Sequence, residues 1–529
     1  MITITTAPTG IKPAFNPIIF ETTSDRYSST AVAVTAVSSG TGGKARYTVA
    51  SHPYKVGDVI LGSAFTGLNV AYNVSQTITV ISALYFETNI SFVATATGSG
   101  TITRTNNNFQ IKCQTMVFDQ PKLNITSVTN DANGKAVLHV TNTFTLGQII
   151  FVEGTTDYDG SATIIQNNVP LSGSLVTINK AFTSDLTGKV RGGTFVGVKR
   201  QDAIIVSGSY LFRMNCAGHV QSTLSPDLID STPANTQTPC SNSIKPFAVV
   251  FTEEFDDTNG ILQTHDTIVS DQFYGARLVL QNKNLRNLNP YTDTHNPRKF
   301  LTNSPIKKLI RPGEEEQLSL LSNPTESIKI AYVKYSLGGV AASVAYTSLI
   351  AVVDSKCILP INSNLFSANE SKIEVWAVDN SNNQLTEKRT FIVDNGSYQN
   401  PIRIYFETTL GGFDAFTFTG DFTRSGKSIK TSYKKTLHLA FVIKDRGVTD
   451  NGNNNVIANE IYSQLLSKSE ALWLNELLQS VSVFTKQIGE TVFTPITILS
   501  DSQPIYDSKG PSQLKLVYTE ANQQLGLEN

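Results

Sequence analysis

The feature that most restricts the fold of this chain is an internal repeat with a period of about 90 residues. Both copies have the same landmarks in the same order: an apolar run, a Gly-Lys-Ala turn, a second apolar run around a glycine, a tyrosine, a phenylalanine and a Thr-Gly pair. In the first copy these are Val34–Val37, Gly43–Ala45, Val56–Ile60, Tyr72, Phe92 and Thr97-Gly98, and in the second they are Ile125–Val128, Gly134–Ala136, Leu146–Ile150, Tyr158, Phe182 and Thr187-Gly188. A repeat of this kind means that each copy is one folding unit.

Within each copy, short alternating runs are separated by Gly, Asn or Asp turns. Arg46–Val49 and Val137–Val140 are examples, and this pattern is typical of paired antiparallel strands. Because two strands cannot bury a core, five or six strands must close on themselves to hide their edges. We therefore predict a small inserted β-barrel or sandwich at residues 31–102 and another at residues 122–195.

The rest of the chain predicts an all-β, multi-domain fold of β-sandwiches and small β-barrels. At 529 residues the chain is too long for a single core. The alternation of Ile328, Ile330 and Tyr332 with polar residues indicates an immunoglobulin-like or fibronectin-like β-sandwich. The expected domains are an N-terminal β core (1–30 with 103–121 and 196–315), the two inserted repeats (31–102 and 122–195), the sandwich (316–398) and a C-terminal β domain (399–529).

One helical segment is expected, at residues 458–479 near the C-terminus. Ser467 and Glu470 have the spacing of a capping box ahead of Leu472, Trp473 and Leu477. Helix is therefore a minor element of an otherwise all-β chain.

Composition limits the classes of partner. Charged residues make up 16% of the chain, net charge is −1 and pI is about 6.6, so no long-range field attracts nucleic acid. The longest apolar stretch, 344–353, is about half the roughly 20 residues that a membrane span needs. No secretion signal is visible at the N-terminus. The four cysteines are widely spread, which predicts free, buried thiols rather than a disulfide framework.

Two arrangements resemble catalytic or nucleotide sites. Residues 420–428 look like a phosphate loop, but they have one residue too many between the glycines and lead into an alternating strand instead of a helix. The acidic run Glu253–Asp257 would supply the two carboxylates of a glycosidase, but adjacent acids are also common on solvated loops. We predict no enzyme, and a tail-associated polysaccharide depolymerase using Glu253 or Asp256 stays open as an alternative.

Three further fragments resemble metal sites. Asp131–Gly134 and 450–454 look like pieces of calcium loops but lack the terminal Glu, and the first fragment is better explained as a hairpin turn. Cys216, His219 and Cys240 would provide three zinc ligands without a fourth nearby. No metal and no cofactor is expected.

Three segments resemble a family of tail or baseplate structural proteins of tailed phages and prophages of Bacteroidetes. They are Asn16–Glu21, then Pro401–Glu407 with Leu410–Phe418, and Trp473–Ser480 with Phe493–Ile498. The resemblance implies a structural component of the tail tip, hub or baseplate, made in the host cytoplasm and located in the virion. It also implies other tail proteins as partners. The two inserted repeats depart from the simpler family members, and host-surface attachment is the role expected of them.

The most specific of these segments contains a turn that has a physical explanation of its own. Gly411 and Gly412 can adopt positive φ between two strands, while Phe413 and Asp414 follow as part of the same structural turn. The lysine-rich strand after it (Lys427, Lys430, Lys434 and Lys435) is interpreted as a solvated edge that resists unwanted pairing.

Assembly is expected to involve several copies of the chain in a ring, because closed symmetry multiplies a modest interface. A second hypothesis makes the barrels receptor-binding or carbohydrate-binding units. Tyr72, Tyr85 and Tyr158, with Phe86, would then stack on a host glycan, although such rings more often fill small cores.

Overall fold

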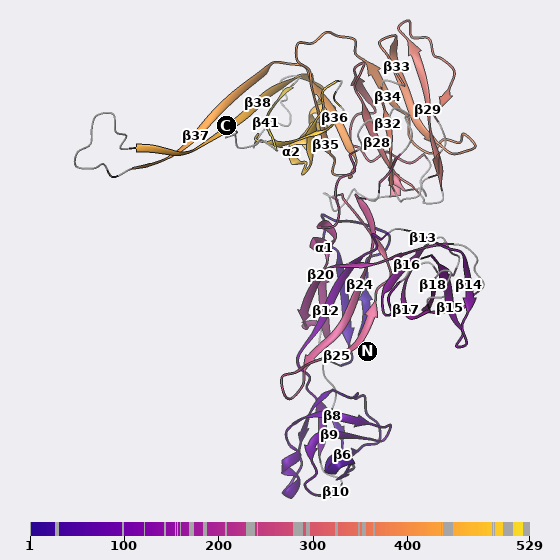
Figure 1. Ribbon diagram of the computed structural model, residues 1–529, viewed down its shortest axis with the longest axis vertical. Helices are drawn as coiled ribbons and strands as arrows, with labels where there is room; N and C mark the ends of the chain where they lie inside the picture. Colours follow the sequence, from indigo (N-terminus) through magenta and orange to yellow (C-terminus); the bar gives the residue numbers. More distant parts are fainter. Residues whose placement is uncertain are drawn as a thin grey trace. The chain divides into compact units, whose positions relative to one another are not determined.

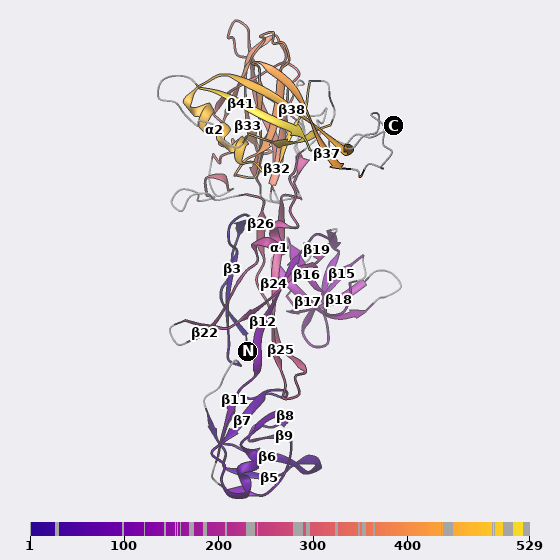
Figure 2. The same ribbon diagram turned by 90° about the vertical axis from the view of Figure 1, so that its left-hand side faces the viewer.

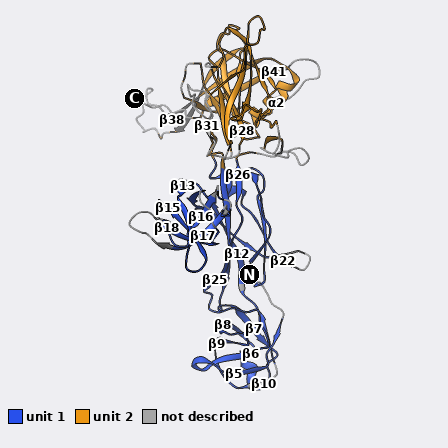
Figure 3. Cartoon of the chain, turned by 90° about the vertical axis from the view of Figure 1, so that its right-hand side faces the viewer, with its two compact units in different colours: residues 1–224, 245–276 blue, residues 225–244, 277–529 orange. Residues whose placement is uncertain are grey.

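The computed structural model divides the chain into two compact units, residues 1–224 with 245–276 and residues 225–244 with 277–529 (Figure 3). The fold is all-β and multi-domain, as the sequence predicts. The structure describes residues 2–26, 31–97, 100–120, 122–141, 144–153, 155, 157–158, 160–168, 174–183, 188–206, 209–228, 238–240, 242–278, 289–292, 297–322, 326–347, 350–351, 356–362, 365–434, 436, 448–488, 490, 492–500 and 512–521.

The first repeat forms a barrel with its own core. Its strands are β4 (Val32–Ala33), β5 (Ala36–Ser39), β6 (Lys44–Thr48), β7 (Val59–Ser63), β8 (Ser75–Ile81), β9 (Tyr85–Ser91), β10 (Ala96–Thr97) and β11 (Thr101–Arg104), in the order β10-β5-β6-β9-β8-β7-β11-β4. The strands at the two ends of this order are neighbours in the sequence, because β4 is followed directly by β5 and β10 by β11. The sheet therefore closes on itself as six strands, which form a lobe of the first unit (Figure 2).

The second repeat closes in the same way. Its strands are β13 (Leu123–Ile125), β14 (Ser127–Asn130), β15 (Lys135–Val140), β16 (Ile149–Glu153), β17 (Gly160–Asn168), β18 (Ser174–Ala181) and β19 (Gly188–Gly192), in the order β13-β19-β16-β17-β18-β15-β14. Because β13 continues into β14, this is again a six-stranded barrel with the same connections as the first.

Equivalent hydrogen bonds show why the repeat retains its landmarks. Gly57 and Gly147, both at positive φ, donate their backbone N–H to Ile78 and Ile164 respectively, each at 2.8 Å. Phe92 N donates to Gly43 O at 2.8 Å, and Phe182 N to Gly134 O at 2.9 Å. Positive φ is accessible to glycine without the steric cost that a Cβ imposes, so these landmarks mark turns that the barrel needs.

Two sheets pack face to face as the scaffold of the first unit. One has the order β1-β3-β22-β21 and the other β2-β26-β24-β12-β20, with β25 paired to β24. Phe20 and Phe212 from the first sheet share a core with Ile111 and Phe251 from the second. The elements are β1 (Ile2–Thr6), β2 (Ile11–Pro13), β3 (Ile19–Ser24), β12 (Asn107–Val117), β20 (Thr194–Asp202), β21 (Ile204–Val206), β22 (Ser209–Asn215), α1 (Ala217–Gln221), β24 (Ile244–Asp256), β25 (Leu262–Val269) and β26 (Phe273–Ala276).

The second unit contains the expected β-sandwich. Its sheets are β23-β32-β28 and β27-β34-β33-β29-β30, with β31 paired to β29, and Leu320 and Leu359 of the first pack with Ile330 and Val375 of the second. The strands are β23 (Thr238–Pro239), β27 (Lys307–Ile310), β28 (Glu316–Leu321), β29 (Ser327–Ser336), β30 (Ala345–Tyr346), β31 (Ile350–Ala351), β32 (Lys356–Ile361), β33 (Glu370–Val378) and β34 (Arg389–Val393).

The sandwich begins earlier in the chain than the sequence suggests. Residues 225–244 and 277–315, expected in the N-terminal core, belong to the second unit. The strand β27 pairs in parallel with the distant β34, and a long-range parallel partner leaves no local signal in a sequence.

The C-terminal sheet has the order β36-β35-β39-β40-β41-β38-β37. Its strands are β35 (Ile402–Glu407), β36 (Phe413–Phe418), β37 (Phe422–Lys434), β38 (Val448–Leu466), β39 (Val483–Thr485), β40 (Thr494–Ile498) and β41 (Ser512–Glu520). The strand β38 pairs with β37 from Val448 to Ile461, and from Asn459 to Leu466 it also pairs with β41 (Figure 1).

The helix expected at residues 458–479 is shorter in the structure. It is α2 (Lys468–Gln479), and the capping box between Ser467 and Glu470 is present. Residues 458–466 instead belong to β38, where Asn459, Ile461 and Ser463 are buried and their neighbours are more exposed. A period of two is the period of a strand, so the prediction of the helix start was wrong while the capping signal was right.

Candidate functional site

The Gly-Gly turn joins β35 to β36 at a point of close backbone approach. Gly411 has φ +76°, and a Cβ there would lie 2.2 Å from the carbonyl oxygen of Arg277. A Cβ on Gly412 would lie 2.3 Å from the carbonyl oxygen of Leu301. The buried ammonium of Lys356 donates to the carbonyl of Gly411 at 2.6 Å. Glycine is therefore required at both positions by space, and at the first also by backbone conformation.

Asp414, two residues after the turn, is a buried carboxylate surrounded by donors. Thr302 Oγ1 donates at 2.6 Å to Oδ1, and Trp473 Nε1 of α2 donates at 2.7 Å to Oδ2. Burial raises the pKa of Asp414, and the nearby Lys308 ammonium opposes that rise. The phenyl ring of Phe413 is also buried, so the predicted turn residues lie inside the fold.

Helix α2 binds the same turn a second time, one helical turn further on. Glu476 accepts hydrogen bonds from the Thr409 backbone N–H at 3.3 Å and from Asn303 Nδ2 at 2.5 Å. Burial and the neighbouring Asp414 raise the pKa of Glu476. Trp473 and Glu476 are three residues apart on one helix face, and they fasten α2 to the turn. Two of the segments that carry the family resemblance are thus in direct contact.

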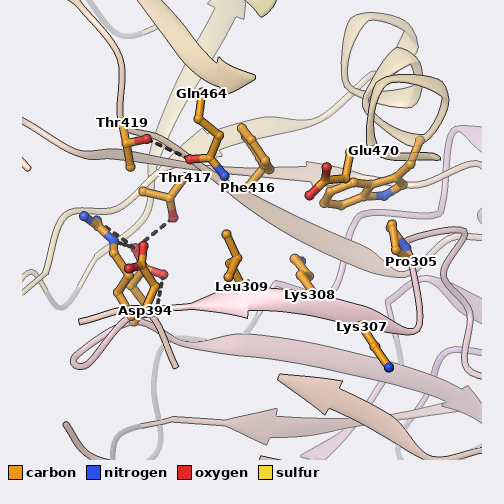
Figure 4. Close-up of a pocket in the computed structure, with 13 residues that line it drawn as sticks. Pro305, Lys307, Lys308, Leu309, Asp394, Phe416, Thr417, Thr419, Gln464 and Glu470 are labelled. Atoms are coloured by element: carbon orange, nitrogen blue, oxygen red, sulfur yellow. Dashed lines mark hydrogen bonds and ion pairs between the residues drawn. The ribbon is translucent and has the colours of Figure 1, made fainter. Parts of the chain in front are cut away.

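A small pocket lies beside this cluster, between β27, β36 and the start of α2 (Figure 4). Its cavity volume is about 30 Å³, room for one or two water molecules and not for a sugar ring. Lys308 Nζ lies 2.7 Å from Glu316 Oε1, and burial lowers the pKa of this lysine. Thr417 Oγ1 donates to Glu314 Oε1 at 2.8 Å. The buried charges here are paired, Lys308 with Glu316 and Arg311 with Glu314, which suits a role in holding strands together.

The residues expected to contact a glycan have a different arrangement. Tyr72 and Tyr158 are buried in the barrel cores, and each phenol caps a loop. Tyr72 OH accepts from Ala94 N at 3.0 Å and donates to Ala94 O at 2.9 Å. Tyr158 OH accepts from Thr183 N at 2.5 Å and donates to Thr183 O.

A sugar would need an exposed ring face, so the glycan hypothesis is corrected for Tyr72 and Tyr158. Phe86 is likewise buried. Tyr85 is half-buried, with the Arg46 guanidinium 4.5 Å from its ring centroid. Of the predicted glycan contacts, Tyr85 alone retains partial exposure.

The acidic run lies on β24 and is occupied by internal partners. Glu253 is fully buried and accepts from Ser24 Oγ at 2.6 Å, and burial raises its pKa. Glu254 accepts from Arg200 Nε at 2.7 Å. Successive side chains of a strand lie on opposite faces. These adjacent carboxylates therefore do not face one substrate.

The other candidate sites are structural turns, strands or buried thiols. Asp131 Oδ1 accepts from the backbone N–H of Asn133 and Lys135 at 2.8 and 2.6 Å, which makes the expected hairpin turn. The phosphate-loop fragment continues into β37, without the helix that such a loop requires. All four cysteines are free and buried, as predicted, and Cys113 Sγ lies 3.6 Å from Cys216 Sγ. Among the residues that the structure describes, no three His, Cys, Asp or Glu groups are placed to hold a metal ion.

One charged cluster was not anticipated from the sequence. It lies where the first barrel joins the scaffold and is centred on the buried Asp58, which lies 3.1 Å from Arg104 Nε and 3.5 Å from Arg26 Nη1. His265 Nε2 lies 3.8 Å from Asp58 Oδ1, and burial followed by the charge of Arg26 lowers the pKa of His265 to about 4. The only sequence signal was that Arg26 and Arg104 flank the inserted repeat.

In the described part of the chain, no helix combines the length and apolar character needed to cross a membrane. Comparison with protein-family models and with curated proteins found no match to this chain.

Proposed function

We propose that the chain is a structural component of a bacteriophage tail, at the tip, hub or baseplate, that acts in virion assembly and catalyses no reaction. The tail assignment derives from the resemblance of three segments. The observation that carries the structural role is the contact between two of those segments: Asp414 accepts from Trp473 Nε1 at 2.7 Å deep in the second unit. The most specific residues of the resemblance therefore hold a hairpin to a helix instead of lining a cleft.

The two barrels support a subsidiary role in host-surface attachment. Each is closed, has its own core and is inserted between strands of the scaffold. A closed module with its own core can present a surface without contributing to the scaffold core. Receptor or carbohydrate binding by these modules is the second candidate function, and it would use surface residues other than Tyr72 and Tyr158.

Cryogenic electron microscopy of intact particles, with an antibody fragment bound to this protein, tests the main proposal. The expected result is density at one end of the tail in several symmetry-related copies. Label absent from the tail, or a purified monomer that turns over a polysaccharide, would contradict it.

The attachment role needs separate deletions of residues 31–102 and 122–193. A single deletion across both would also remove β12, which pairs with β20 and β24 at the centre of the scaffold sheet. If the barrels bind the host, each deletion variant is incorporated into particles normally while adsorption falls. Unchanged adsorption with both barrels deleted would exclude this role.

A further inference from the structure

Two buried thiols lie beside one another in the scaffold core of the first unit. Cys113 lies on β12, in one scaffold sheet, and Cys216 directly follows β22, in the other. Both side chains belong to the core that the two sheets share. Their Sγ atoms lie 3.6 Å apart. A disulfide has an S–S separation of about 2.05 Å, so the two sulfurs would have to approach by about 1.5 Å for a bond to form.

The backbone at Cys216 is anchored by hydrogen bonds that do not involve its thiol. Its N–H donates to Ile18 O at 2.9 Å, and its carbonyl accepts from His219 N at 3.0 Å. Cys216 is the residue before α1, and its side chain makes no capping hydrogen bond. The approach of the sulfurs therefore requires side-chain rotation and not the movement of a strand.

The surroundings give the two thiols different acidities. The hydrogen bond with Cys113 lowers the pKa of Cys216, and Thr115 and the Lys199 ammonium lower it further, against the opposing effect of burial. The same hydrogen bond, together with burial, raises the pKa of Cys113. The thiolate is the reactive form of cysteine. Cys216 is therefore the sulfur that reacts first with an oxidant, and Cys113 is the second thiol beside it.

We propose that Cys113 and Cys216 form an oxidation site, at which hydrogen peroxide converts the two thiols into a disulfide between the scaffold sheets. The Cys216 sulfur attacks one peroxide oxygen and becomes a sulfenic acid. The O–O bond breaks, and the other oxygen leaves as water with the proton that Cys216 has released. The Cys113 sulfur then attacks the Cys216 sulfur, and the sulfenic oxygen leaves with the Cys113 proton as a second water. The two sulfurs lose two electrons in total, which reduce the peroxide.

The short helix α1 is the route by which an oxidant reaches this pair. It has five residues, Ala217–Gln221, and begins directly after Cys216. A helix of this length is unstable in isolation, so its local opening exposes Cys216 without unfolding of the sheets. Hydrogen peroxide needs a smaller opening than an alkylating reagent. The reaction is therefore expected over hours, more slowly than the oxidation of an exposed thiol.

The disulfide would strengthen the scaffold around the second barrel. The chain between Cys113 and Cys216 contains that whole barrel, and β12 pairs with β20, the strand that follows it. A disulfide that closes a long loop restricts the unfolded chain most. Thiols stay reduced in the cytoplasm, whereas disulfides persist outside the cell. A chain that leaves the cytoplasm would gain this bond, but the chemistry does not rest on a location in a tail, because it needs only the two thiols and the peroxide.

Thiol counting on the full-length chain tests the site. The double variant Cys240→Ala with Cys357→Ala retains only Cys113 and Cys216. It is purified with reductant, treated with hydrogen peroxide while folded, freed of peroxide with catalase, and then denatured in an alkylating reagent for intact mass measurement. Both thiols should become inaccessible to alkylation, with the loss of two hydrogens in mass, and dithiothreitol should restore them. Peptide mapping of oxidised wild type should show Cys113 joined to Cys216.

A matched control adds Cys113→Ala to the double variant. Its remaining Cys216 has no second thiol in the chain, so it should stay alkylatable or gain oxygen. The fluorescence of the two tryptophans, which lie in the second unit like Cys240 and Cys357, checks that these substitutions leave that unit folded. A methionine-containing peptide in the same tube verifies that the peroxide is active.

Three results would overturn the oxidation site. They are thiols that both remain alkylatable after peroxide treatment of the double variant, added oxygen on Cys216 beside a free Cys113, and a disulfide between two chains. Amide exchange tests the consequence separately: oxidation should slow exchange in β12 and β22 of the double variant about tenfold or more and leave the control unchanged. Unchanged exchange in a chain that has formed the bond would overturn its role in holding the sheets, while microscopy decides the location in the tail independently.

Discussion

Replacing Gly411 by alanine separates the cost of backbone conformation from the cost of space at the Gly-Gly turn. Gly339 is the matched control: it lies in the same unit at φ +79°, and a Cβ there meets nothing within 4 Å, whereas at Gly411 (φ +76°) the Cβ meets a carbonyl oxygen at 2.2 Å. Gly339→Ala should cost about 1–2 kcal/mol, the penalty for an L-residue in this backbone region. Gly411→Ala bears the same penalty and must also displace backbone by about 1 Å, which adds about 1–3 kcal/mol of overpacking.

The displacement also disturbs the Lys356 bond to the Gly411 carbonyl, a charged hydrogen bond worth about 1.5–3 kcal/mol. We therefore expect Gly411→Ala to lower the free energy of unfolding by about 2–4 kcal/mol more than Gly339→Ala. Urea unfolding followed by tryptophan fluorescence measures this, because Trp376 and Trp473, the two tryptophans of the chain, both lie in the second unit. A difference below about 0.5 kcal/mol, within the scatter of distant additive sites, would refute the close approach at the turn.

Three further predictions concern the first unit and the thiols. Tyr72→Phe and Tyr158→Phe should each weaken their barrel by about 1 kcal/mol, because a buried phenol hydrogen bond is lost. The amides of Ala94 and Thr183 should then exchange faster, and exchange no faster than in Tyr85→Phe would contradict the shared role of these tyrosines. Because the pKa of His265 is about 4 when folded and 6.5 when unfolded, the unfolded chain binds the proton first, so stability is retained above pH 6.5 and is lost as pH falls from 6.5 to 4, by at most about 3 kcal/mol. Amide exchange in β24 and β25 should show that the wild type loses stability relative to His265→Gln as pH falls over that range. A difference that stays constant would be inconsistent with a neutral buried imidazole. Finally, since all four cysteines are buried, a thiol reagent should label none of them in the native protein within minutes and all four in denaturant, so rapid native labelling would argue against the packing around Cys113 and Cys216.

Local signals in the sequence predicted local structure well. The repeat landmarks located two closed barrels, because four of the landmark glycines (Gly43, Gly57, Gly134 and Gly147) lie in turns at positive φ, where a side chain would be strained. Ser467 and Glu470 identified the start of α2 through a hydrogen-bonding pattern confined to four residues. The extension of the helix to residue 458 failed because Ile461 and Leu466 suit either a helix or a buried strand, and pairing with β37 and β41 decides between them.

Long-range contacts could not be predicted. Nothing near Asp414 in the sequence identifies Thr302 or Trp473 as its hydrogen-bond donors, and Asp58 gives no indication of the two arginines that neutralise it. The tyrosines of the repeat were correctly singled out, but their role depended on burial. An aromatic ring that recurs in a repeat fits a barrel core as well as a binding face, and only the closure of the sheet distinguishes the two.

The closure of each barrel has a consequence for how such a chain can change. Val32 pairs with Ile102, and Leu123 pairs with Val190, so the entry and exit of each module are ladder partners about 5 Å apart. For the strands of the scaffold, a whole barrel therefore replaces no more than a short hairpin loop. A gene encoding this protein can therefore gain, lose, duplicate or exchange a module of this size at either position while the strands on both sides keep their register. A foreign domain with adjacent termini should likewise be accepted at these two insertion points.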